Sequence, residues 1–146
     1  MIKIELHRTS GEFGFEVKDS MDHILHTDSS KDGGGNDSGF RPMQLVLAAM
    51  GSCSAIDIVS ILKKQRQQLT DISIVVEGDR EMNIIPALWE KVAIHVTLKG
   101  NVDDEKANRA VELSIEKYCS VAETLRRAGA EITWTVNNII VDKTGV

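Results

Sequence analysis

Residues 43–58 constrain the fold most, because their pattern predicts a helix that is nearly all apolar or small and has no polar face. Pro42 fits the first turn of a helix, where its missing N–H costs nothing. Apolar and small residues recur at three- and four-residue spacings through residues 44–68, at Leu45, Ala48, Ala49, Ser52, Ile56, Val59 and Leu62. A helix that is apolar all round is buried on all sides, whereas the polar residues 63–68 must reach water. We therefore predict a central helix that runs from the interior to the surface.

Alternation of apolar and polar residues predicts strands on both sides of this helix. Strands are expected at residues 2–7, 13–17 and 23–27 before it, and at residues 72–76, 89–100 and 132–141 after it. A second helical pattern begins at an Asp cap, Asp103 or Asp104, and stops at Gly129. The order β-β-(β)-α-β-β-α-β predicts the α+β class, with antiparallel sheet covering a central helix.

Residues 29–40 form a Ser-, Asp- and Gly-rich segment with three consecutive glycines at its centre. We expect a flexible loop within one domain that spans residues 1–146. The segment lacks the Gly-Lys-Ser/Thr ending of a phosphate-binding loop and does not connect a buried strand to a helix. Phosphate binding is therefore not expected.

Charge and hydropathy exclude several classes of partner. The net charge is −5 and no long basic run is present, so nucleic acid is not an expected partner. The longest continuous apolar runs are too short to span a bilayer, so no membrane is expected either. Residues 2–7 alternate and lack the apolar core of a signal peptide. We predict a cytoplasmic protein.

The chain has two cysteines, Cys53 and Cys119, one in each predicted helix. In a reducing compartment they are either a catalytic or sensing pair or two inert buried side chains. A thiol with a pKa of about 8.5 is only about 3% thiolate at pH 7, so peroxide chemistry requires a nearby cation or hydrogen-bond donor. Packed helices lie about 8–10 Å apart, and a disulfide needs Cα atoms within about 7 Å. Two facing helices with small residues can just satisfy both limits.

The other polar residues do not indicate a metal site. His23 and His26, with Asp22 and Asp28, match no standard zinc spacing, and we interpret them as surface residues. Asp57 lies one turn after Cys53 on the same face. Its carboxylate would raise the pKa of a nearby thiol, and we interpret it as a hydrogen-bond partner of a neighbouring element.

Both cysteine segments resemble motifs of the OsmC/Ohr family. The first is residues 42–59, PMQLVLAAMGSCSAIDIV, and the second is residues 117–122, KYCSVA. The order of strands and loop before the first motif also matches, and the resemblance covers essentially the whole chain. It is closest to an OsmC-like branch that carries Cys-Ser-Ala-Ile-Asp and Lys-Tyr-Cys-Ser.

The resemblance implies a fold and a reaction. The fold is an intertwined homodimer with antiparallel sheets wrapped around two long central helices. Cys53 would attack an organic hydroperoxide and become a sulfenic acid, and Cys119 would condense with it to a disulfide. An external dithiol, lipoyl-bearing in the Ohr branch, would then reduce the disulfide. No metal or organic cofactor is implied.

One position departs from the family pattern. Met43 stands where the peroxidases carry a Glu that orients an Arg. Arg41 and Arg8 are our candidates for activating the Cys53 thiolate, with solvated surface arginines as the competing interpretation. Two alternative functions therefore stay open: a dimer that binds a small apolar ligand with inert cysteines, and a thiol redox sensor without efficient turnover.

Overall fold

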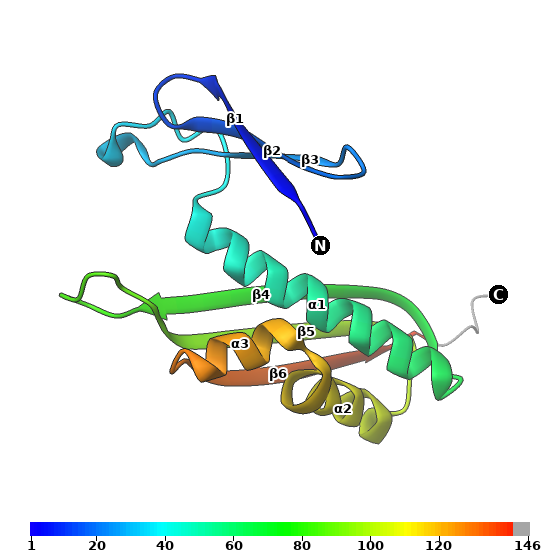
Figure 1. Ribbon diagram of the computed structural model, residues 1–146. Helices are drawn as coiled ribbons and strands as arrows, with labels where there is room; N and C mark the ends of the chain where they lie inside the picture. The colour runs from blue at the N-terminus through cyan, green and yellow to red at the C-terminus, as the bar shows by residue number, and fades with distance from the viewer. Residues whose placement is uncertain (142–146) are drawn as a thin grey trace. The chain divides into compact units, whose positions relative to one another are not determined.

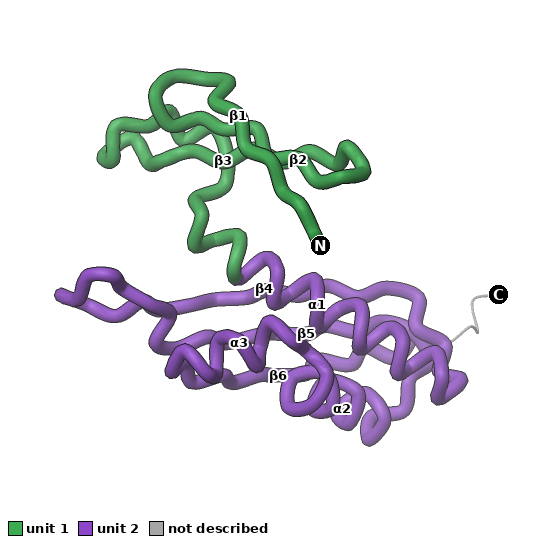
Figure 2. Tube along the Cα trace, viewed as in Figure 1, with its two compact units in different colours: residues 1–46 green, residues 47–146 purple. Residues whose placement is uncertain are grey.

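The computed structural model describes residues 1–141, which form two compact units (Figure 2). The N-terminal unit, Met1–Val46, contains β1 (Ile4–Ser10), β2 (Gly14–Asp19) and β3 (Ile24–Thr27). They form an antiparallel sheet in that order, with Leu6 opposite Val17 and Val17 opposite Leu25. The three strands predicted before the long helix are confirmed.

Asp28 organises the segment that follows β3. Its Oδ1 accepts a hydrogen bond from the Ser29 amide at 2.7 Å, and its Oδ2 accepts from the Asn36 and Ser38 amides at 3.1 and 3.2 Å and from the Ser38 hydroxyl at 2.7 Å. These bonds, first of all that from the Ser38 hydroxyl, hold the pKa of Asp28 below its usual range. The segment includes one 3₁₀ turn, η1 (Lys31–Gly33). Its mobility, and the single domain expected for the chain, stay predictions.

The C-terminal unit, from Leu47 onward, contains a sheet with three helices on one face (Figure 1). Most of α1 (Pro42–Lys64) belongs to it, followed by β4 (Gln68–Arg80), β5 (Trp89–Asn101), α2 (Asp104–Leu113), α3 (Ser120–Arg127) and β6 (Glu131–Ile140). The sheet order is β4-β5-β6. The α+β class with two sheets is confirmed.

The pairing in this sheet is mixed, whereas the sequence predicted antiparallel sheet. Strands β4 and β5 pair antiparallel, but β5 and β6 pair parallel. A parallel pair needs a crossover connection of a dozen or more residues. Helices α2 and α3 lie between β5 and β6 in the chain and supply that crossover.

The core of the C-terminal unit lies between α1 and the inner face of the sheet. Alternate residues of β5 are almost completely buried, namely Val92, Ile94, Val96 and Leu98. On one face of α1, Met50, Ile58 and Leu62 are buried as well. Gly51 faces β4, where an added Cβ would lie 3.1 Å from Val76 Cγ2. The missing side chain therefore lets α1 lie close to the sheet.

Only part of α1 is buried, although the sequence predicted burial on all sides. Ile56 is 71% exposed and Val59 is 40% exposed. With 23 residues, α1 is also long and apolar enough, by length and composition alone, to cross a membrane. The core helix of a soluble protein passes the same test, so the expectation of no membrane partner stays a prediction.

The second predicted helix is two helices rather than one. Helix α2 ends at Leu113, a π-helical turn η2 (Ser114–Tyr118) follows, and Cys119 adopts an extended conformation with φ −71° and ψ 103°. Helix α3 then begins at Ser120. The apolar stripe runs through both helices, so residue spacing did not reveal the break.

Candidate dithiol site

The structure brings the two cysteines together. The Sγ atoms of Cys53 and Cys119 and a carboxylate oxygen of Asp57 all lie within 4.8 Å of one another. Cys53 lies on α1 and is half-buried, while Cys119 is buried at the junction between η2 and α3. Both thiols are free. The distance between the sulfurs fits a pair that forms a disulfide after a small rotation of the side chains.

Cys119 owes its position to the break between the helices. Its amide donates a hydrogen bond to the Ser114 carbonyl at 2.7 Å and closes the π-helical turn. Its Sγ accepts a hydrogen bond from the Ala122 amide at 3.3 Å, so the cysteine caps the N-terminus of α3. The hydroxyl of Ser54 donates to the same sulfur at 3.5 Å. The buried Cys119 sulfur thus accepts hydrogen bonds from two elements, α1 and α3.

Burial dominates the ionisation of Cys53. Desolvation first, and then the hydrogen bond and charge interaction with Cys119, raise the pKa of the Cys53 thiol above its ordinary value. Hydrogen bonds from the Val121 and Ser120 amides lower the pKa, but burial outweighs them. These amides belong to the first turn of α3, where backbone N–H groups lack partners in the helix. These donors could not be predicted from the sequence, because no helix start was predicted at this position.

Asp57 and two buried serines complete the site. The Ser114 hydroxyl lies 3.2 Å from Asp57 Oδ2 and 3.4 Å from the Ser54 carbonyl oxygen. The interpretation of Asp57 as a partner of a neighbouring element is therefore confirmed. Sequence reasoning missed Ser54 and Ser114. Both serines lie on the apolar stripe of a helix, which predicts burial. Because a buried hydroxyl needs a hydrogen-bond partner, this placement was the signal that could have identified them.

The two candidate arginines belong to the N-terminal unit. Arg41 forms an ion pair with Asp37, with 3.0 Å between Arg41 Nη2 and Asp37 Oδ1. Arg8 lies on β1 opposite Phe15. Their action on Cys53 stays a prediction. On α3, Arg126 and Arg127 both pair with Glu123, at 2.9 and 2.7 Å.

The histidines considered as ligands pair with carboxylates of the N-terminal sheet. His23 Nδ1 lies 2.8 Å from Asp19 Oδ2, and His26 Nε2 lies 3.9 Å from Glu16 Oε2. Asp28 is occupied by the backbone of its own loop. The interpretation as surface polar groups fits His23 and His26, whose side chains are exposed, but it is wrong for Asp28, which is buried among the backbone amides of its loop.

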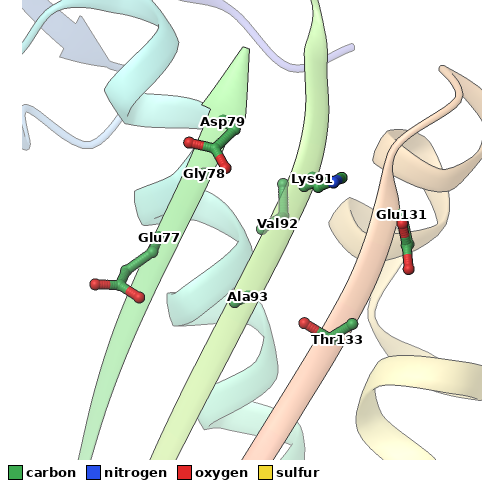
Figure 3. Close-up of a pocket in the computed structure, with 8 residues that line it drawn as sticks. All are labelled: Glu77, Gly78, Asp79, Lys91, Val92, Ala93, Glu131 and Thr133. Atoms are coloured by element: carbon green, nitrogen blue, oxygen red, sulfur yellow. The ribbon is translucent and has the colours of Figure 1, made fainter. Parts of the chain in front are cut away.

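A separate pocket of about 510 Å³ lies on β4, β5 and β6 and holds neither cysteine. It is lined by Glu77, Gly78, Asp79, Lys91, Val92, Ala93, Glu131 and Thr133 (Figure 3). Its charged groups are three carboxylates and one ammonium.

An α+β fold that brings together two free thiols, one from α1 and one from the junction before α3, is that of a candidate thiol-redox protein. The family model of OsmC-like proteins matches residues 34–135, and the chain belongs to this family. It is 43% identical over 98 residues to protein YhfA of Escherichia coli K12, covering 66% of this chain and 72% of that protein.

Solved structures agree over nearly the whole chain. A hypothetical protein from Aquifex aeolicus is 33% identical, with a TM-score of 0.78 over 94% of this chain and 97% of the other. An organic hydroperoxide resistance protein OsmC from Legionella pneumophila is 19% identical, with a TM-score of 0.73 over 94% of this chain and 96% of the other. The second likeness shows the shared fold alone. Together they confirm the family resemblance found in the sequence.

Proposed function

We propose that the protein reduces organic hydroperoxides through Cys53 and Cys119. The observation that carries this proposal is the approach of the two sulfurs and the Asp57 carboxylate to within 4.8 Å of one another. The structural likeness to an organic hydroperoxide resistance protein supports the choice of substrate class. The family alone defines only a peroxide or redox role.

The proposed reaction has two chemical steps and a reduction. The Cys53 thiolate attacks the O–O bond, takes one oxygen as a sulfenic acid and releases an alcohol after protonation. The Cys119 thiol then displaces the sulfenic hydroxyl, which forms a disulfide and one water. An external dithiol returns both cysteines to thiols by disulfide exchange. No metal or organic cofactor takes part.

Because the pKa of Cys53 is raised, the proposed reaction needs a nearby cation that favours the thiolate. Arg41 and Arg8 are the proposed sources. A guanidinium within about 4–6 Å of a thiol favours the thiolate and offsets desolvation. If one of them acts, alkylation of Cys53 has a midpoint below pH 8, whereas a midpoint at or above about 8.5 means that neither does.

The proposed working form is a homodimer in the cytoplasm, without nucleic-acid or membrane partners. The exposed apolar side chains Ile56 and Val59 support the dimer, since large exposed apolar patches mark association sites. The two free thiols support the cytoplasm, where thiols stay reduced.

The test is consumption of an organic hydroperoxide with a lipoyl-type dithiol as reductant. Cys53→Ser should abolish consumption, and Cys119→Ser should form a sulfenic acid once without turning over. Ser52→Ala is the matched control. Ser52 is exposed on the same helix, and in the described structure its hydroxyl donates a hydrogen bond to the Ala48 carbonyl of that helix. If Cys53→Ser consumes peroxide as fast as the unaltered protein, the proposal fails.

A second candidate is the binding of a small apolar ligand, with cysteines that do not turn over. It is favoured by the raised pKa of Cys53 and by a pocket of about 350 Å³ in the N-terminal unit. Aromatic and apolar side chains of Phe13, Phe15 and Pro42 line this pocket. A ligand that co-purifies, together with alkylation like that of free cysteine, would support it. A thiol redox sensor would instead oxidise readily and turn over poorly.

A further inference from the structure

We propose that Cys53, Asp57 and Cys119 bind a zinc ion when both thiols are reduced. This goes beyond the proposed peroxide reaction, which uses no metal. Cys53 and Asp57 lie four residues apart on one face of α1, and Cys119 approaches from the junction before α3. Two ligands at i and i+4 on a helix with a third from another element is a spacing that suits a metal ion.

The distances allow the three ligands to converge. Zinc binds thiolates at about 2.3 Å and carboxylate oxygens at about 2.0–2.2 Å, so tetrahedral ligands lie about 3.4–3.8 Å from one another. In the structure the three ligand atoms lie within 4.8 Å of one another. Small side-chain rotations of Cys53 and Asp57, both half-buried, close the difference. The buried Cys119 provides the fixed point.

Each ligand already has hydrogen-bond donors that orient it. The Cys119 sulfur accepts from the Ser54 hydroxyl and the Ala122 amide. The Asp57 carboxylate accepts from the Ser114 hydroxyl at 3.2 Å. Amides in the first turn of α3 donate to the Cys53 sulfur. Such outer partners fix the orientation of metal ligands and raise affinity.

The ligand types select the metal. Two thiolates disfavour the hard cations Mg²⁺ and Ca²⁺, which prefer oxygen. A carboxylate as third ligand disfavours Cu(I), which prefers sulfur, and suits Zn²⁺. The divalent charge also removes the repulsion between two adjacent thiolates. Three protein ligands leave the fourth tetrahedral position to water.

Zinc and peroxide would compete for the same sulfur. A metal-bound Cys53 thiolate has its reactive lone pair engaged, so zinc protects it from oxidation. Conversely, the disulfide between Cys53 and Cys119 removes two of the three ligands, so oxidation releases the ion. The site would therefore bind zinc only in the reduced protein.

The experiment is a Zn²⁺ titration of the reduced, metal-free full chain against a chromophoric chelator, repeated with Co²⁺ as a spectroscopic probe. We expect one ion per chain and a sulfur-to-cobalt charge-transfer band. Cys53→Ser and Cys119→Ser should each weaken binding by more than about 100-fold, because loss of an outer-shell group alone costs about 10–100-fold. Asp57→Asn and Ser114→Ala should each weaken it by about tenfold or more.

Asp79→Asn is the matched control, because it removes a carboxylate from the acidic pocket on the sheet and not from the dithiol site (Figure 3). Circular dichroism of each variant checks that it folds, and a misfolded variant is replaced by the corresponding alanine. Zinc affinity that is unchanged in both cysteine variants, or lost in Asp79→Asn, overturns the inference. Peroxide consumption is measured separately on metal-free protein, so failure of the peroxidase proposal does not mimic failure of this one.

Discussion

The hydroxyl of Ser54 donates a hydrogen bond of 3.5 Å to the sulfur of Cys119, and both side chains are buried. Ser54 follows Cys53 directly on α1, so this bond ties the helix of the first cysteine to the second cysteine itself. The alignment of the two thiols therefore depends on a residue without redox chemistry of its own.

Ser54→Ala should lower the free energy of unfolding by about 1 kcal/mol, the net value of a typical hydrogen bond. It should also slow formation of the disulfide, because the Cys119 sulfur loses the hydrogen bond that holds it against α1. Urea unfolding and oxidation kinetics measure the two effects. In Ser52→Ala, which removes an exposed hydroxyl bonded to the Ala48 carbonyl at 2.8 Å, stability should stay within about 0.5 kcal/mol of the original. Equal losses in both variants would contradict a specific role for Ser54.

Substitutions of Cys119 should separate its chemistry from its cap. Cys119→Ala removes the acceptor for the Ala122 amide at the start of α3 and should cost about 0.5–2 kcal/mol. Cys119→Ser keeps an acceptor there and should be more stable than Cys119→Ala. Both should lose disulfide formation. Thermal unfolding of the two variants checks the order, and equal stability would show that the sulfur does not cap α3.

The sequence predicted the strands and the long helix well, because alternation and three- to four-residue spacing report the burial of single residues. It also paired Cys53 with Cys119, through the family resemblance of the two segments. It missed the break at Cys119, because the buried Val111 and Ile115 before it and Leu125 after it continue one apolar stripe. The parallel pairing of β5 with β6 was missed for a related reason, since side-chain alternation carries no strand direction.

The amide donors near Cys53 could not be predicted from the sequence, because the break before α3 that frees these amides was not predicted. The serines at positions 54 and 114 were hidden in apolar stripes that tolerate a small hydroxyl. Ionisation of the site depends on such contacts between segments distant in sequence, whereas secondary structure depends mainly on neighbours. The fold was therefore easier to predict than the electrostatics of the thiols.

Removing Cys119 should make Cys53 easier to ionise. Burial and, next, the contact with Cys119 raise the pKa of the Cys53 thiol, and only the thiolate is alkylated. The rate of alkylation therefore rises with pH, and Cys119→Ser should shift its midpoint to lower pH. Mass spectrometry of iodoacetamide labelling across pH 6–10 measures the shift. A midpoint that moves upward would show that Cys119 supports the Cys53 thiolate instead.

Asp28→Asn should loosen the segment after β3. The Asp28 carboxylate accepts four hydrogen bonds, and its lowered pKa means that the folded protein favours the ionised form. This contribution is present above the usual pKa of 3.8 and is lost as pH falls through the lowered value. Hydrogen exchange should speed up at the Ser29, Asn36 and Ser38 amides in the variant. Asp32→Asn, an exposed change in the same segment, should leave exchange there unchanged.

The apolar outer side of α1 should be the place where two chains meet. Ile56 is 71% exposed in the described chain, so Ile56→Lys removes no core packing and should leave the fold intact while it converts the proposed dimer to a monomer. Val75→Lys is the matched control, since Val75 is 58% exposed on β4 and alternates with the inward-facing Ile74 and Val76. It should leave the assembly unchanged. Sedimentation of both variants decides the point, because a dimer that survives Ile56→Lys would place the interface elsewhere.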